Sequence, residues 1–276
     1  MTTPFIQQPN AAAVPVLHKV MRYELRDVAR SRWLIGYTLF FLLLTDVLLR
    51  FSGSTANALA SLVTVVQVVI PLVNVVFGTI YLYNAREFTE LLLAQPIGRR
   101  QLFGGIYLGL VLPLSAGFAL GVGLPFAMHG VDDATQRTTV ALLVGIGVAL
   151  TFAFTGIAFL LALRLEDKAK ALGAAIGIWL LTAVLYDGLV VLLVAMFADN
   201  PLERPLIAAM LLNPVDIARV LLVLRLDVSA LMGYTGAVFK AFFGRRSGLL
   251  LATAVLAVWA GAPALAALRA FRRKDF

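Results

Sequence analysis

Six long apolar runs constrain the fold of this chain more than any other feature of its sequence. The runs cover residues 33–49, 59–83, 103–128, 138–163, 172–197 and 249–270. A helix needs roughly 20 apolar residues to cross the hydrocarbon core of a bilayer, and the six runs are of that order. Because 61% of the residues are hydrophobic and 14% charged, most of the backbone must satisfy its hydrogen bonds within lipid. The sequence therefore predicts an all-α polytopic membrane protein with six transmembrane helices.

Lysine and arginine are unequally divided between the two sides of this arrangement. Fifteen of them precede the first run, lie between runs two and three or four and five, or lie at the end of the sixth run and after it, whereas the opposite short loops hold only Arg50 and Arg137. The side with more positive charge faces the cytoplasm, so the chain is predicted to be a multi-pass protein of the cytoplasmic (inner) membrane with both termini in the cytoplasm. The formal charge of +8 then reflects topology and not a nucleic-acid partner. Residues 1–15 form a polar leader without the pattern of a removable signal peptide, and its role is left unassigned.

Residues 16–32 have the pattern of an amphipathic helix lying in the membrane interface. Lys19, Arg22, Arg26 and Arg30 fall within one arc at 100° per residue, with apolar residues opposite. Glu24 interrupts the apolar arc, together with Asp27. Two interpretations stay open: the acids pair with nearby arginines, or they face a protein neighbour.

A second amphipathic element, residues 86–96, separates the second and third runs on the predicted cytoplasmic side. Phe88, Leu91 and Leu92 fall on one face of a two-turn helix and Glu87 and Glu90 on another. Pro96 is predicted to end the helix, because proline cannot continue the hydrogen-bond ladder, and Arg99 marks the membrane edge. The helix either buries one face against a soluble partner or is a solvated connection.

Polar side chains inside the runs are the candidate intramembrane sites. Asp187 lies in the middle of the fifth run, where an ionisable group costs about 2.5–3.5 kcal/mol, so it is expected to face the bundle interior with Tyr186, Gln67 or Asn74 as its partner. Its role is either a structural hydrogen bond or gating and proton movement. Asp46 is predicted to pair with Arg50 one turn later.

Residues 198–248 form the one long connection on the predicted outer side. It separates the first five spans, within residues 33–197, from the sixth span and the basic cytoplasmic tail, residues 249–276. Asn213 is a good N-cap, Pro214 suits the first helical position, and Asp216 complements the helix dipole, so a helix is predicted to begin there and to carry Arg219. These helices either lie at the outer surface or enter the membrane as a hairpin over residues 206–243, which would give eight spans.

The basic N-terminal helix followed by the segment EFTELLLAQPIGR, residues 87–99, resembles the permeases of ABC-2 type transporters. Thr89 belongs to this motif, and Phe88 departs from it where the family has glycine. The resemblance implies a type V exporter-like fold, with residues 16–32 as the elbow helix and 86–96 as the coupling helix that docks on a cytoplasmic ATPase. The chain has no phosphate-binding G-x-x-x-x-G-K-[ST] loop, so ATP and Mg²⁺ are expected in that partner subunit. A second copy of this chain is implied as well.

The run LLNPVDIARVL, residues 211–221, and the aromatic-Asp pair before it resemble the Nos-type permeases, which support copper-site maturation of nitrous oxide reductase. That resemblance implies a periplasmic, copper-handling β-helical partner. Its expected docking surface is residues 213–246, including Asn213, Pro214, Asp216 and Arg219.

Metal chemistry within the chain itself is not expected. There is no cysteine, His18 and His129 fall on opposite sides, and the six methionines are scattered. An intramembrane enzyme is disfavoured because Asp187 has no His or Glu companion in any span. The expected role is therefore that of a membrane subunit without catalysis or cofactor, which relays motion to an outer partner; the alternative is an exporter of a lipid, glycan or drug-like substrate.

Overall fold

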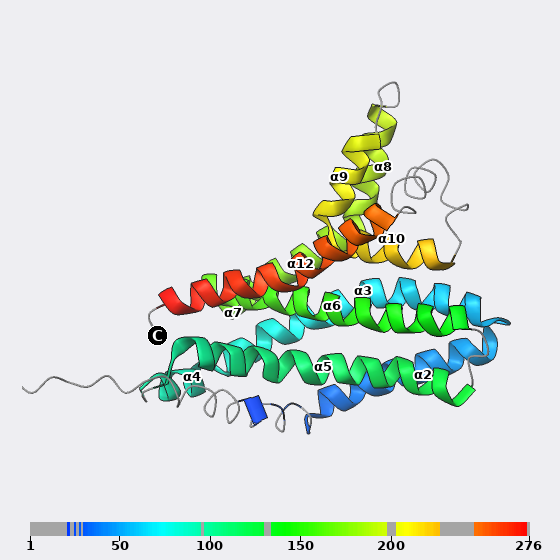
Figure 1. Ribbon diagram of the computed structural model, residues 1–276. Coiled ribbons are helices and arrows are strands. Elements are labelled where there is room, and N and C mark those ends of the chain that lie inside the picture. Colours follow the sequence, from blue (N-terminus) through cyan, green and yellow to red (C-terminus); the bar gives the residue numbers. More distant parts are fainter. Residues whose placement is uncertain are drawn as a thin grey trace, which may run out of the picture.

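The computed structural model describes residues 21–22, 25, 28, 30–94, 97–129, 134–197, 203–226 and 246–274, and all regular structure in these ranges is helical (Figure 1). Its elements are α2 (Arg32–Phe51), α3 (Thr55–Asn84), α4 (Arg86–Leu93), α5 (Arg99–His129), α6 (Ala134–Arg164), α7 (Lys168–Leu180), the π-helical turn η1 (Leu181–Leu185), α8 (Tyr186–Met196), α9 (Glu203–Leu212), α10 (Pro214–Leu226) and α12 (Arg246–Arg273).

Six helices within the described ranges are long and apolar enough to cross a membrane, which confirms the six predicted spans. They are Arg32–Phe51, Thr55–Asn84, Arg99–His129, Ala134–Arg164, Lys168–Met196 and Ser247–Arg273. In addition, Pro205–Leu212 and Pro214–Leu224 form an apolar pair bent by 110°, as in a broken span or a re-entrant loop. With this pair counted as one span, the described residues contain up to seven crossings. The second half of the hairpin that would give eight lies outside the described residues.

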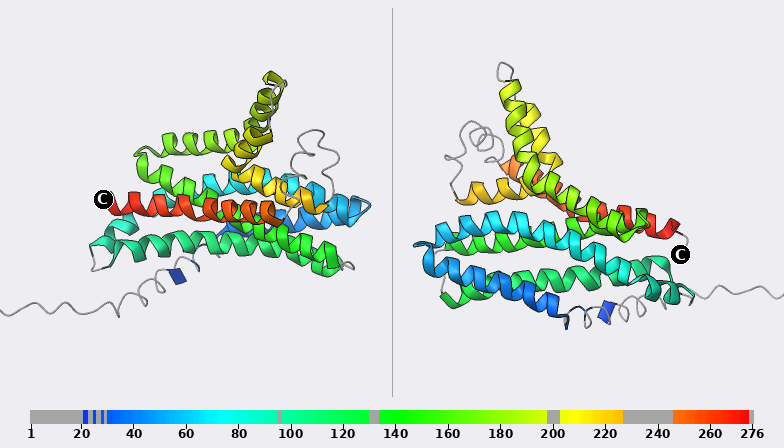
Figure 2. Two further views of the ribbon diagram at one scale, coloured as in Figure 1. Left: turned by 45° about the horizontal axis from the view of Figure 1, so that its top comes forward. Right: turned by 180° about the vertical axis from the view of Figure 1, so that it is seen from behind.

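Five of the spans form an elongated bundle in which α12 and α3 both pack on α6, and α2 packs on α5 (Figures 1 and 2). The core is rich in aromatic rings: Phe41 meets Phe118 edge to face at 5.0 Å, and Phe103 lies 5.6 Å from Phe271 of α12. Within lipid the hydrophobic effect does not drive helices together, so van der Waals packing of this kind holds the bundle together.

The fifth span behaves differently from the others. It follows the bundle along α7 and then turns away at η1, so that α8 and α9 project side by side from the bundle (Figures 1 and 2). No side chain of α8 is buried, and Val191 and Met196 are about two-thirds exposed. The turn at η1 thus separates a packed half of the span from an uncovered half.

The N-terminal segment and the connection after α4 are described only in part. Val28 is buried and Arg22 exposed, in keeping with the predicted apolar and basic sides, but Glu24 and the leader lie outside the described residues. The helix predicted to continue to Pro96 ends at Leu93, where the Ala94 N–H bonds to Glu90 O, and Pro96 also lies outside the described residues.

Close packing of α6 on α12 depends on Gly156. A Cβ atom at this position would lie 2.8 Å from the backbone N of Ala264, which cannot move aside as a flexible side chain can. We expect Gly156→Ala to lower the free energy of unfolding by about 1–3 kcal/mol. Gly145→Ala, on the same helix with no atom within 4 Å, is the matched control and is expected to be neutral. Equal stability of the two variants in a denaturant titration would contradict the packing argument.

Candidate functional site

The short helix α4 presents a mixed acidic and apolar surface at one end of the bundle. Glu87, Glu90 and Leu91 are exposed, with Leu91 at 69%, whereas Thr89 is buried and its hydroxyl donates to Ala85 O at 2.7 Å. Leu92 packs against the core. The predicted grouping of Leu91 with Leu92 is therefore wrong: Leu91 stands one turn from Glu87, on the face that the bundle leaves open.

Arg86, the first residue of α4, ties this helix to the end of α6. Its Nη2 donates to Ala162 O at 3.1 Å and to Leu165 O at 3.3 Å, and its guanidinium lies over the Tyr83 ring at 4.0 Å. The Tyr83 hydroxyl donates to the same Leu165 carbonyl at 2.7 Å. The last carbonyls of a helix have no intrahelical partner and carry partial negative charge, so these donors satisfy them.

Arg99, the first residue of α5, makes the equivalent contact with the end of α12. Its Nη1 donates to Arg272 O at 3.0 Å and to Lys274 O at 2.7 Å. Lys274 in turn donates to Leu163 O of α6 at 3.0 Å, and partial burial, with a smaller contribution from Arg86, lowers the pKa of its amine. The segment from α4 to α5 is thus anchored to α6 and α12 at its two ends.

The sequence reasoning missed these anchors. The sequence predicts that Arg86 and Arg99 flank spans on the cytoplasmic side and that Arg99 ends the coupling motif, but it does not predict their contacts with other helices. The sequence does contain the acceptors, because the last carbonyls of every helix are unpaired. However, Arg86 and Ala162 are 76 residues apart and Arg99 and Arg272 are 173 residues apart, so only the fold shows which arginine meets which helix end.

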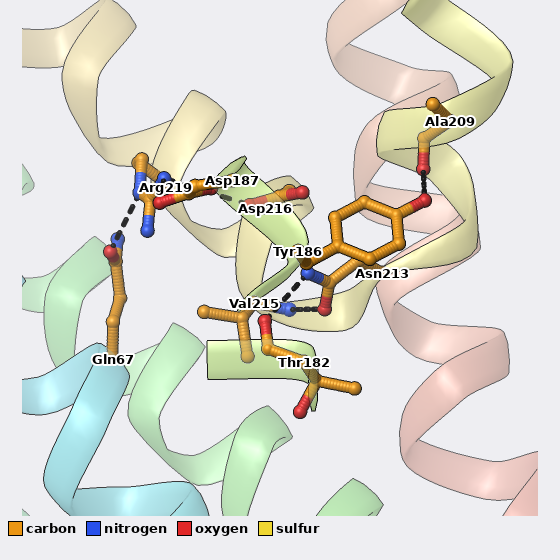
Figure 3. Close-up of polar contacts among 9 residues, drawn as sticks. All are labelled: Gln67, Thr182, Tyr186, Asp187, Ala209, Asn213, Val215, Asp216 and Arg219. Atoms are coloured by element: carbon orange, nitrogen blue, oxygen red, sulfur yellow. Dashed lines mark hydrogen bonds and ion pairs between the residues drawn. The ribbon is translucent and has the colours of Figure 1, made fainter. Parts of the chain in front are cut away.

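A second polar cluster lies where α10 crosses α3 and α8 (Figure 3). Arg219 donates from Nη1 to Asp187 Oδ2 at 2.5 Å and from Nε to Gln67 Oε1 at 3.0 Å. The Asp187 side chain is 48% exposed, whereas Gln67 is buried. The partner of Asp187 is therefore Arg219; Gln67 reaches it only through that arginine, and neither Tyr186 nor Asn74 has a hydrogen bond to it.

The predicted docking residues are parts of the same cluster. Asn213 caps α10 through Val215 N at 3.1 Å and donates from Nδ2 to Thr182 O of η1 at 2.8 Å. Asp216 Oδ1 lies 3.7 Å from Arg219 Nη1. The prediction that Asn213, Pro214 and Asp216 face a partner is not supported, because all three are buried within this chain.

Two further contacts fix the projecting helices. The Tyr186 hydroxyl donates to Ala209 O at 2.6 Å, which joins α8 to α9 (Figure 3). Trp259 Nε1 donates to Leu211 O at 3.3 Å, which joins α12 to α9. Helix α12, whose C-terminal end Arg99 contacts, therefore also contacts the bent pair α9–α10 further along its length.

Other polar residues of the spans form contacts outside this cluster. Asn74 accepts from Thr155 Oγ1 at 3.1 Å, joining α3 to α6. The predicted ion pair of Asp46 with Arg50 is present at 2.7 Å, and His129 Nε2 lies 3.5 Å from the other oxygen of Asp46. Asp132 and Asp133, considered with His129, lie outside the described residues. In the ranges that the structure describes, no three His, Asp or Glu side chains gather as metal ligands.

Comparisons with known proteins agree with these features. The model of the ABC-2 family transporter proteins matches residues 18–276. A probable ABC transporter permease protein NosY of Pseudomonas aeruginosa is 28% identical over 95% of this chain and 99% of its own length. A second probable NosY permease, of Stutzerimonas stutzeri, is 26% identical over 92% of this chain and 97% of its own length.

Proposed function

This chain belongs to the ABC-2 transporter family, and from that premise we propose that it couples a cytoplasmic ATPase to an extracytoplasmic partner. The chain would be the membrane subunit, with no catalytic activity or cofactor of its own, and ATP and Mg²⁺ would bind to the ATPase. Two copies would form the membrane part of the assembly in the inner membrane, with both termini cytoplasmic.

One observation carries this proposal: α4 offers an open face to a soluble partner while its flanks are anchored to two spans. Glu87, Glu90 and Leu91 are exposed, and Arg86 and Arg99 hold the ends of α6 and α12. A push on α4 would therefore be transmitted to both spans, because rigid helices move as bodies and not by continuous deformation.

The contacts of α12 suggest where the motion goes. Trp259 links this helix to α9, and the Asp187–Arg219–Gln67 cluster holds α10 to α8 and α3. Movement of α12 would shift the bent pair α9–α10 and with it the projecting α8–α9 hairpin. Asn213, Pro214 and Asp216 would then position the outer segment instead of forming its contact surface.

For the biological process, we propose support of copper-site maturation in nitrous oxide reductase. The proposal rests on the resemblance of the segment at residues 211–221 and on similarity to two proteins named as NosY permeases. The outer partner would be a periplasmic copper-handling β-helical protein, reshaped by motion and not supplied with metal through this subunit.

The test is affinity purification of the tagged protein from native membranes, followed by mass spectrometry. Recovery of an ATPase together with a periplasmic β-helical copper protein is expected. An ATPase alone would favour an exporter of a lipid, glycan or drug-like substrate. Recovery of neither would overturn the proposed role.

The anchors can be tested separately from assembly. Because the chain has no cysteine, Leu250→Cys provides a single site for a spin label. Leu250 lies on α12 and is 71% exposed, and the label gives one distance between the two copies of the chain. We expect nucleotide to change this distance in the parent protein and not in Arg86→Ala/Arg99→Ala, which should still bind the ATPase. The exposed neighbour Arg100→Ala is the matched control. A nucleotide response in the double variant equal to that of Arg100→Ala would contradict the relay.

A further inference from the structure

An apolar groove of about 500 Å³ opens between the N-terminal segment, α2 and α5. Its apolar lining includes Leu25, Leu34, Leu112, Ala116 and Leu120, and Arg22 is its only charged lining residue. We propose that this groove is a binding site for an anionic phospholipid, with one acyl chain in the groove and the phosphate at Arg22. This site is independent of the coupling role proposed above.

The groove exists because a short side chain lies between two long ones on α5. Leu112 and Leu120 are exposed, at 38% and 61%, and Ala116 lies midway between them, one helical turn from each. Behind this floor α2 approaches α5 closely: a Cβ atom on Gly121 would lie 2.9 Å from the backbone carbonyl oxygen of Thr38. The floor is therefore fixed by backbone packing, and no described helix of this chain fills the hollow.

The position of the groove decides which kind of ligand fits it. Two of its walls, α2 and α5, are membrane-spanning candidates, and exposed Leu39 and Leu43 continue the apolar surface of α2. Thr38 is the one uncharged polar side chain in the lining. A polar solute would lose hydrogen bonds to water without replacement here, whereas a hydrocarbon chain loses none.

Arg22 gives the groove a polar end. It is exposed and belongs to the segment whose spacing predicts a basic face at the membrane interface, which is the depth of lipid headgroups. A guanidinium presents several N–H donors in a plane and matches phosphate oxygens. An apolar groove with one cation at the interfacial end thus complements a lipid that carries negative charge at its head and an alkyl chain below it.

The experiment uses the full chain in nanodiscs of phosphatidylcholine with a minor fraction of photoactivatable phosphatidylglycerol, followed by mapping of the labelled peptides. Labelling is expected on the segment 112–120 of α5 and around Leu34 of α2. Ala116→Phe, which fills the groove, should reduce this labelling to background, and the smaller Ala116→Leu should reduce it in part. Ala127→Phe, at another exposed alanine of α5, is the matched control and should leave it unchanged.

The role of Arg22 has its own readout. Arg22→Gln is expected to lower labelling of the groove by phosphatidylglycerol about fivefold, the effect of one basic residue on an anionic lipid, and to leave labelling by a phosphatidylcholine probe unchanged. Equal labelling by the two lipids, or no effect of Ala116→Phe, would mean ordinary annular lipid and would overturn the proposal. A large gain in labelling after removal of residues 1–15 would place the chain's own leader in the groove and overturn it as well.

Discussion

Changing Glu87 and Leu91 together to arginine is expected to abolish assembly with the ATPase subunit. Both side chains lie on the open face of α4, and Leu91 is 69% exposed, so the chain itself loses little packing. At an interface, however, the change removes an apolar anchor and introduces two charges that must be desolvated. Residues at the centre of an interface are worth about 2–4 kcal/mol each, so binding should weaken about 100-fold or more.

The measurement is co-purification of the ATPase with the tagged membrane subunit, quantified against the parent protein. Insertion and folding are checked by the yield and size-exclusion profile of the variant in detergent, which should not change. Lys170→Glu reverses an exposed charge in the first turn of α7 and serves as the control that should retain the ATPase. Normal recovery of the ATPase with the arginine variant would show that α4 is not the docking helix.

Hydropathy predicts the spans of this protein well, because the bilayer imposes a length and an apolar composition on each helix. Local rules also succeed where their cause is local: Asn213 and Pro214 start α10 as predicted, and Asp46 pairs with Arg50 within one helical turn. These features need no knowledge of which helices are neighbours.

The turn at η1 could not be predicted in this way. The segment LTAVL has no glycine or proline, the usual causes of a break, and its propensity is that of a continuous span. The structure supplies a tertiary partner instead, since Asn213 donates to the Thr182 carbonyl within the π-helical turn. Thr182 and Asn213 are 31 positions apart. One lies in the predicted fifth span and the other in the predicted outer connection, so the sequence alone does not show that they meet.

The partner of Asp187 was missed for a related reason. Residues 198–248 are predicted either to lie at the outer surface or to enter the membrane as a hairpin, and neither alternative identifies Arg219 as a neighbour of a residue in the fifth span. The bend of 110° between α9 and α10 brings α10 back over α3 and the bundle. An acidic residue in the middle of a span predicts a cationic partner. For Asp187 the nearest candidates are the arginines of the segment that follows the fifth span.

Arg219→Met is expected to be the most destabilising single substitution in the membrane part of this chain. Arg219 is the one cation whose contacts with Asp187 and Asp216 are present in the described structure, and it also bonds Gln67. Its removal leaves the Asp187–Asp216 pair of acids without a cation, and breaking a buried pair from one side costs several kcal/mol. Because Asp187 is half exposed, we expect a loss of about 3 kcal/mol in the free energy of unfolding, measured in a mixed-micelle SDS titration.

A matched substitution and a double variant separate the ion pair from loss of packing. Arg50→Met breaks the Arg50–Asp46 pair, whose arginine is 60% exposed, and should cost less than about 1 kcal/mol. Arg219→Met/Asp187→Leu should be more stable than Arg219→Met alone, because only one carboxylate is then left without a cation. If Arg219→Met costs no more than Arg50→Met, the cluster does not hold α10 to α8. Motion of α12 would then reach the projecting hairpin through the packing of α10 on α12 and the contact of Trp259 with α9, and not through the polar cluster.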